Sequence, residues 1–187
     1  HQVPFYGTIF LCADDHHVKS IISKISRPIV TYGLSSKVDI QAVNIKCEEN
    51  RMNFRVIDNK YNHNEFDILI NFPGDHFVRN TLAAISIALE YGVSKNNIQS
   101  ALANFEGVSR RYEIYNNILI KHKTIKVIDD YGHHPTEIEA VLKATKKGFK
   151  NKKVNLVFQP HRFSRTRDCY EDFIRVLKIP DRVFLFD

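Results

Sequence analysis

The sequence lacks several features that would assign it to large classes of proteins. It has no apolar run of roughly eighteen residues, so we predict no membrane-spanning helix. The segment from His1 to Tyr6 has no basic stretch followed by an apolar one, so we expect no signal peptide there. No Gly-x-x-x-x-Gly-Lys-Ser/Thr motif occurs, so we expect these 187 residues to lack a phosphate-binding loop of their own.

Cysteine is scarce, and its three residues are Cys12, Cys47 and Cys169. Their odd number and wide spacing argue against a disulfide framework and against a Cys-x-x-Cys metal site. The histidine pairs His16-His17 and His133-His134 are adjacent, whereas two ligands on one helix face stand four residues apart. We therefore expect no protein-bound metal of this kind, and a reducing compartment, the cytoplasm.

Acidic residues are outnumbered, with 21 Asp and Glu against 27 Lys and Arg, and the net charge is +6. Much of the excess surrounds the end of one predicted helix, at Lys143, Lys146, Lys147, Lys150, Lys152 and Lys153. Cations are favoured at helix C-termini, so we interpret this group as solvated surface. A nucleic-acid binder is the alternative, and it would lose affinity steeply as salt rises.

The first part of the chain reads as strands followed by helices. Apolar, partly alternating segments predict strands at 8–12, 28–32, 38–45, 51–58 and 65–71, with turns at 48–50 and 59–64. Asp14 or Asp15 is expected to cap a helix that runs to about Ile25. Alanine- and leucine-rich sequence predicts a helix over 76–91, ended by Gly92, and Ser94 is expected to cap another over 95–105.

The second part alternates between strands and helices. Short strands are expected near 112–120, then strands at 125–128, 154–158 and 182–186, with helices at 135–147 and 167–177. This alternation predicts a parallel sheet with flanking helices, so the fold class is α/β. We place a domain boundary near Arg110 or Arg111, which gives domains 1–110 and 111–187. A sheet of three parallel strands is small, so we expect more chain to follow Asp187.

The densest cluster of chemically capable residues runs from Asp129 to Glu137, with sequence DDYGHHPTE. It follows an apolar strand and opens a helix at Pro135, and ligands bind at such strand ends in open parallel sheets. Helix N-termini also favour anions. The alternative is helix capping by Asp130 or Thr136 with exposed histidines.

A second cluster, QPHRFSRTR from Gln159 to Arg167, also lies between an apolar strand and a helix. Arg162 and Arg165 stand three residues apart, a spacing that lets them point together on a turn. Guanidinium groups bind carboxylate or phosphate in two-point fashion, whereas a merely basic helix start is disfavoured by the helix dipole.

Two weaker clusters complete the set. Pro73-Gly74-Asp75-His76 with Asn80 opens the long helix, and capping by Asp75 explains it equally well. The motif Phe105-x-Gly107-x-x-Arg110-Arg111 lies at the proposed boundary, where an arginine can close over a ligand or simply face solvent.

Together these motifs resemble the Mur ligase family, within it the group that attaches L-alanine to UDP-N-acetylmuramate. The matching segments, which span essentially the whole chain in the expected order, are HQVPFYG (1–7), the PGDH helix with NTLAAISIALEYG, FEGVSRR (105–111), DDYGHHPTEI (129–138) and QPHRFSRT (159–166). Several motifs in order are far more specific than any one of them.

The resemblance implies an α/β architecture: part of a central ATPase α/β domain (1–110), followed by part of a Rossmann-like parallel-sheet domain (111–187). A UDP-binding domain and the phosphate loop would precede His1. ATP and Mg²⁺ are the implied cofactors, UDP-N-acetylmuramate and L-alanine the substrates, and neither nucleic acid nor membrane is expected as a partner. The fragment alone is expected to be inactive.

The resemblance also implies roles for individual residues. By this resemblance, four residues bind the nucleotide: His76 and Asn80 contact adenine, Arg111 contacts the phosphates, and Asp130 contacts the nucleotide as well. Five residues would lie where alanine and the muramoyl carboxylate meet: Tyr131, His133, His161, Arg162 and Arg165. Of these, His133, Arg162 and Arg165 would be catalytic. The chain departs from the family at Phe77, where asparagine is usual, and at Ser109, where glycine is usual.

Two alternatives to this function remain. One is the sister ligase that attaches a recycled tripeptide to the same sugar, although the His-Arg-Phe-Ser-Arg run favours the alanine enzyme. The other is a ligase remnant that binds nucleotide without catalysis, although the intact motif residues argue against decay.

Overall fold

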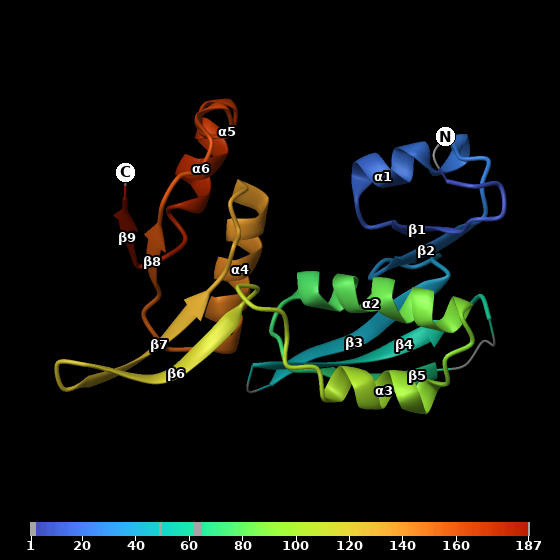
Figure 1. The fold of residues 1–187 in the computed structure, drawn as a ribbon, viewed down its shortest axis with the longest axis horizontal. Helices are drawn as coiled ribbons and strands as arrows, with labels where there is room; N and C mark the ends of the chain where they lie inside the picture. The colour runs from blue at the N-terminus through green and yellow to red at the C-terminus, as the bar shows by residue number, and fades with distance from the viewer. Residues whose placement is uncertain (1–2, 49, 62–64, 187) are drawn as a thin grey trace. The chain divides into compact units, whose positions relative to one another are not determined.

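The computed structural model describes residues 3–48, 50–61 and 65–186. Residues 1, 2, 49, 62–64 and 187 lie outside this description, and with them the start of the HQVPFYG segment and parts of the turns predicted at 48–50 and 59–64. The described chain forms two compact units. Unit 1 runs up to Asn71 and includes Asp75–Phe105, while unit 2 contains Phe72–Gly74 and the described residues from Glu106 onward (Figure 1).

Unit 1 is built on a five-stranded sheet in the order β1-β2-β3-β4-β5 (Figure 1). Its strands are β1 (Ile9–Cys12), β2 (Ile29–Gly33), β3 (Ile40–Glu48), β4 (Arg51–Asp58) and β5 (Glu65–Ile70). β1, β2 and β3 pair in parallel, whereas β3-β4 and β4-β5 are antiparallel. All five predicted strands are confirmed, and only β3 differs noticeably, since it begins and ends later than expected.

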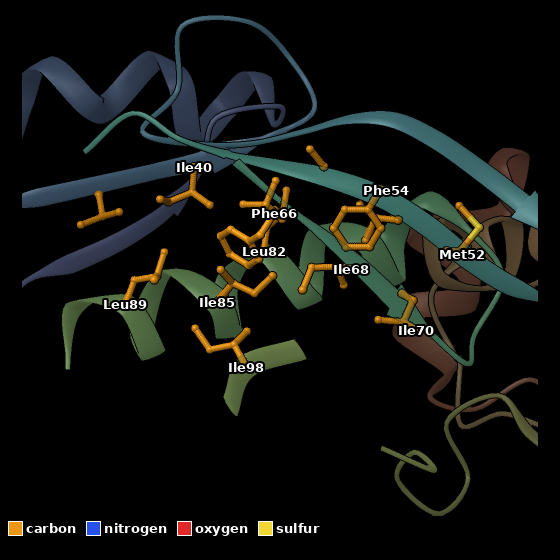
Figure 2. Packing of buried hydrophobic residues seen from close by; sticks show 14 residues of the cluster. Ile40, Met52, Phe54, Phe66, Ile68, Ile70, Leu82, Ile85, Leu89 and Ile98 are labelled. Atoms are coloured by element: carbon orange, nitrogen blue, oxygen red, sulfur yellow. The ribbon is translucent and has the colours of Figure 1, made fainter. Parts of the chain in front are cut away.

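The core of unit 1 lies between this sheet and two helices, α2 (Asp75–Glu90) and α3 (Lys95–Ala103). The alternation predicted for β4 and β5 is what turns their apolar residues to the core, because successive side chains on a strand point to opposite faces. Figure 2 shows Leu82, Ile85 and Leu89 of α2 and Ile98 of α3 packed beneath these strands. Ser94 caps α3 by accepting the N–H of Asn97, as predicted.

The first helix is shorter than predicted. α1 spans His16–Ile21 and continues only as the 3-10 turn η1 (Ile22–Lys24). Asp15 is its N-cap and accepts the N–H of Val18, while Asp14 points elsewhere. The helix buries no residue, so packing does not extend it past a single turn and a half.

Unit 2 contains two small sheets and three helices (Figure 1). Its elements are β6 (Glu113–Ile120), β7 (Lys123–Asp129), α4 (Pro135–Gly148), β8 (Asn155–Phe158), α5 (Phe163–Asp168), α6 (Tyr170–Val176) and β9 (Arg182–Leu185). The core joins α4, β8 and α6, and the rings of Phe158 and Phe173 stack with centroids 5.6 Å apart. The predicted α4 start at Pro135 is confirmed.

The prediction of a single parallel sheet of three strands for this part is wrong, because the strands divide between two sheets. β8 and β9 pair in parallel across a helical crossover, as predicted, but β7 pairs antiparallel with β6. Lys121 and His122 connect β6 and β7 with φ of 49° and 68°. Positive φ at both central residues is the geometry of a tight hairpin turn, and these two residues lack the usual Asn-Gly signal.

The helix predicted over 167–177 also differs. Two short helices, α5 and α6, replace it, and Cys169 separates them with a non-helical φ of −111° and ψ of 23°. The second of these helices carries the buried residues Phe173 and Val176, whereas α5 buries none.

Candidate active site

The loop between β7 and α4 is shaped by the carboxylate of Asp130. Its Oδ2 accepts the N–H of Tyr112 at 2.9 Å, and its Oδ1 accepts the N–H of Gly132 at 2.7 Å. A Cβ on Gly132 would stand 2.8 Å from Asp130 Oδ1, so the absent side chain permits this turn. Asp130 therefore ties the start of β6 to the loop, and each of its oxygens keeps a lone pair for a further donor.

The first turn of α4 is closed by a capping box formed by His134 and Glu137. The N–H of Thr136 donates to His134 Nδ1 at 3.3 Å, and the N–H of His134 donates to Glu137 Oε2 at 3.2 Å. The capping residue is thus His134, neither Asp130 nor Thr136, which corrects the alternative considered from the sequence. Histidine is not among the usual N-cap residues, so the sequence carried only a weak signal for this role.

Glu137 organises the histidine pair from the helix. Its Oε2 also accepts the N–H of His133 at 3.0 Å and lies 3.7 Å from His133 Nδ1. Partial burial acts to raise the pKa of Glu137, but the two donated N–H groups, His133 and the guanidinium of Arg111 lower it below the usual glutamate value. The sequence placed Glu137 in the cluster without giving it a role.

Tyr131 and His133 lie together at the rim of this loop. Their ring centroids are 5.6 Å apart in an edge-to-face arrangement, and His133 Nδ1 stands 3.2 Å from the carbonyl oxygen of Tyr131. The guanidinium of Arg110 covers the Tyr131 ring at 5.2 Å and approaches Asp129 Oδ2 at 3.7 Å. The N–H of Tyr131 also donates to the carbonyl oxygen of Arg110, so the link before β6 is fastened to the cluster.

The second cluster surrounds the start of α5. Arg162 is the N-cap at a φ of 68°, and Arg165 lies within the helix, half-buried. Nη1 of Arg165 donates to the carbonyl oxygen of His161 at 3.3 Å, so the backbone before the helix orients this guanidinium. His161, Arg162 and Phe163 are exposed, and they are therefore available to a ligand.

The junction of α5 and α6, two residues after the second cluster, approaches the start of α4. Sγ of Cys169, at the junction of α5 and α6, stands 3.9 Å from Nε2 of His134. Because His134 Nδ1 accepts an N–H, a neutral His134 ring carries its proton on Nε2, facing the sulfur.

In unit 1 the predicted residues lie in the first turns of α2. His76 is half-buried and Asn80, one turn later, is exposed. The ring of Phe77 lies 4.2 Å from that of His76 and packs against the core. Asp14, which the sequence suggested only as a helix cap, instead accepts hydrogen bonds from the backbone N–H groups of Leu34 and Ser35 and from the guanidinium of Arg79 in this helix.

No group of three or more His, Cys, Asp or Glu side chains that could hold a metal ion occurs among residues 3–48, 50–61 and 65–186. None of the helices formed by these residues has the length and apolar character needed to cross a membrane.

Comparison with known proteins gives matches in both units. The model of the "Mur ligase middle domain" matches residues 1–88, and that of the "Mur ligase, glutamate ligase domain" matches residues 110–187. The UDP-N-acetylmuramate–L-alanine ligase of Hydrogenovibrio crunogenus is 46% identical over 187 residues, covering 100% of this chain and 40% of that protein. The enzyme of the same name from Vesicomyosocius okutanii subsp. Calyptogena okutanii is 46% identical over 186 residues, covering 100% of this chain and 39% of that protein.

A solved structure supports the same assignment. The UDP-N-acetylmuramate-alanine ligase of Thermotoga maritima superposes with a TM-score of 0.75 at 28% identity, covering 95% of this chain and 37% of that chain. This chain thus spans about two fifths of the length of its curated relatives. Matches to two successive Mur ligase domains, together with a shared fold, establish that the chain belongs to the Mur ligase family.

Proposed function

We propose that this chain is part of an ATP-dependent ligase that forms an amide between UDP-N-acetylmuramate and L-alanine, in the synthesis of peptidoglycan precursors. The observation that carries the proposal is the 46% identity, over all 187 residues, to a relative of that name. Because the chain covers 40% of that relative, the activity is proposed for the whole protein. The chain would supply the latter part of the ATP-binding domain (1–110) and the first part of the C-terminal domain (111–187).

The reaction has two steps. An oxygen of the muramoyl carboxylate attacks the γ-phosphorus of ATP, which forms an acyl phosphate and releases ADP. The amine nitrogen of L-alanine then attacks the acyl carbon, loses a proton, and the acyl C–O bond breaks to release phosphate. Both steps gather negative charge on oxygens, so the protein contributes mainly by positioning and by charge stabilisation.

The proposed nucleotide residues differ in chemistry. The exposed amide of Asn80 can donate and accept hydrogen bonds at the adenine edge, with His76 one turn earlier. Phe77, whose ring packs against the core cluster, offers no such hydrogen bond. The exposed guanidinium of Arg111 suits phosphate oxygens, and Asp130 would contact the nucleotide as well.

The proposed substrate residues surround the two loops of unit 2. Arg162 and Arg165 would bind the carboxylates of alanine and of the muramoyl group, and His161 and Tyr131 would line the same place. His133, held by Glu137 and Tyr131, is the proposed catalytic histidine, suited to take the proton that the alanine amine loses. Orientation of this imidazole by the carboxylate of Glu137 supports the role.

Mg²⁺ is proposed as a further cofactor on the basis of the family. No described residue is assigned to it, because residues 3–48, 50–61 and 65–186 contain no group of three potential ligands. This agrees with the usual binding of Mg²⁺ by substrate phosphates and only one or two carboxylates.

An isotope experiment on the full-length gene product tests the proposed chemistry. UDP-N-acetylmuramate labelled with ¹⁸O in its carboxylate is incubated with ATP, Mg²⁺ and L-alanine. Mass spectrometry of the released phosphate is expected to find one labelled oxygen per phosphate, because the carboxylate oxygen leaves with phosphorus. Turnover that leaves the phosphate unlabelled would contradict the acyl phosphate.

A further inference from the structure

The carboxylate of Asp14 joins three elements of unit 1. It follows β1, and its Oδ2 accepts the N–H of Leu34 at 2.9 Å while its Oδ1 accepts the N–H of Ser35 at 3.0 Å, both just after β2. Nε of Arg79, in α2, donates to the same Oδ2 at 2.9 Å. One side chain thus connects the carboxyl ends of two parallel strands to a helix.

This junction is built into the fold and partly shielded from solvent. The Asp14 side chain is 13% exposed and that of Arg79 is 37% exposed. A Cβ on Gly33 would stand 2.7 Å from Asp14 Oδ1, so only glycine at this position lets the carboxylate reach its partners. A charge-assisted contact in such a place is stronger and more directional than one on an open surface.

Arg79 stands on the part of α2 that carries the proposed adenine residues. It is three positions after His76 and directly precedes Asn80, and residues three apart are neighbours on a helix surface. The opposite end of α2 has a separate attachment, where Glu90 accepts the hydroxyl of Tyr61 at 2.6 Å and that of Thr8 at 2.9 Å. The helix is therefore fastened at both ends by different carboxylates.

Apolar burial and the hydrogen bond to Asp14 hold α2 in different ways. Burial of Val78, Leu82 and Ile85 holds α2 on the sheet, but the hydrophobic effect has no direction and leaves small rotations and shifts of the helix inexpensive. The hydrogen bond from Arg79 to Asp14 has a direction, and it sets the height and rotation of the first turns relative to the ends of β1 and β2.

We propose that Asp14 and Arg79 are positioning residues for the adenine nucleotide, because together they hold the first turns of α2 where His76 and Asn80 contact the base. The inference rests on the proposed function, in which α2 lies on the adenine side. Neither residue touches the reacting atoms in this proposal, and their effect on the nucleotide passes through α2.

The test compares nucleotide affinity among variants of the full-length protein by isothermal titration calorimetry with ATP. Arg79→Met keeps the backbone N–H donors on Asp14 and removes only the link to α2, and about 10-fold weaker ATP binding is expected. Affinity for UDP-N-acetylmuramate is expected to stay at the wild-type value. Arg79→Lys keeps the charge but loses the guanidinium geometry, so an intermediate affinity is expected.

Tyr61→Phe is the matched control, because it removes a hydrogen bond that fastens the other end of the same helix. It is expected to leave ATP affinity within about 2-fold of wild type. If Arg79→Met binds ATP with wild-type affinity, the positioning inference is overturned while the proposed function stands. If the methionine variant does not fold, wild-type ATP affinity in Arg79→Lys has the same consequence. Equal weakening by Tyr61→Phe would also overturn it, while a wild-type protein that binds no ATP would overturn the proposed function as well.

Discussion

At the scale of single residues, the loop before α4 owes its shape to two carboxylates. Asp130 accepts the N–H groups of Tyr112 and Gly132, and Glu137 accepts those of His133 and His134. Both are therefore fixed before any ligand arrives, and a site fixed in advance loses less entropy on binding. The backbone of the two motif histidines is held by Glu137, a residue of the same motif to which the sequence gave no role.

The lowered pKa of Glu137 predicts an effect on stability in acid. A carboxylate with a depressed pKa in the folded state stabilises the fold fully above its unfolded pKa, and the contribution is lost as pH falls through the folded value. Glu137→Gln is therefore expected to flatten the decline of thermal stability as the pH falls below about 5 toward about 3. Calorimetry of the full-length protein at several pH values measures this dependence of thermal stability on pH. Glu171→Gln, at an exposed position, is the control and is expected to retain the wild-type dependence.

Arg165 is the residue at which geometry, beyond charge, is expected to matter. Arg165→Lys keeps the charge but removes the two-point contact with a carboxylate, which predicts a fall in kcat/KM for L-alanine of about 10- to 100-fold. The KM for ATP is expected to stay unchanged. Arg167→Lys is the control, because Arg167 pairs with its neighbour Asp168 at 2.9 Å, and equal losses in both variants would argue against a specific role.

At the scale of elements, a helix or strand could be predicted from the sequence when interactions within the element itself determine it. α2 and β4 were predictable because their own apolar periodicity specifies them. The antiparallel β6-β7 pair was not, since its turn at Lys121 and His122 uses positive φ in residues that rarely adopt it. The break at Cys169 was missed because the sequence on both sides favours helix.

The same limit applies to the candidate site. Its clusters could be found from the sequence, because polar groups follow apolar strands and open helices at 129–137 and 159–167. The partners that hold those residues could not. The contact of Asp14 with Arg79 joins residues 65 positions apart, and the approach of Cys169 to His134 joins residues 35 apart. Sequence spacing carries no information about such pairs.

The link after α3 offers a test of backbone strain. Gly107 has a φ of +106°, and a Cβ there would stand 2.8 Å from the ring of Phe72. Gly107→Ala is expected to lower the free energy of unfolding by about 2–4 kcal/mol, because strain and steric overlap add. Gly92→Ala, at a φ of +71° with no atom within 4 Å of the new Cβ, isolates the strain and is expected to cost about 1 kcal/mol in denaturant titrations. Equal losses would contradict the packing against Phe72.

At the scale of the whole molecule, the chain consists of two units with separate cores. In unit 1 the core lies between the five-stranded sheet and α2 with α3, and in unit 2 between α4, α6 and β8. Each unit carries residues of the proposed site. Unit 1 has nucleotide residues on α2, and unit 2 has the nucleotide residues Arg111 and Asp130 together with the substrate residues around α4 and α5. The family explains this division, since its middle and C-terminal domain models match successive parts of the chain.

The absence of a phosphate-binding loop from the 187 residues predicts how they behave alone. Without the backbone N–H groups that cradle the phosphates, the isolated chain is expected to release no phosphate in the presence of ATP, UDP-N-acetylmuramate and L-alanine. A phosphate-release assay of the isolated chain beside the full-length protein measures this, and substrate-dependent release by the isolated chain would contradict it.

The central claim is the choice of substrate, and a coupled phosphate-release assay of the full-length gene product tests it most directly. UDP-N-acetylmuramate, ATP and Mg²⁺ are supplied with either L-alanine or L-alanyl-γ-D-glutamyl-diaminopimelate. The account predicts turnover with L-alanine. Turnover with the tripeptide alone would identify the recycling ligase instead, and release with neither, from a protein that still binds ATP, would identify a nucleotide-binding remnant; either result would contradict the account.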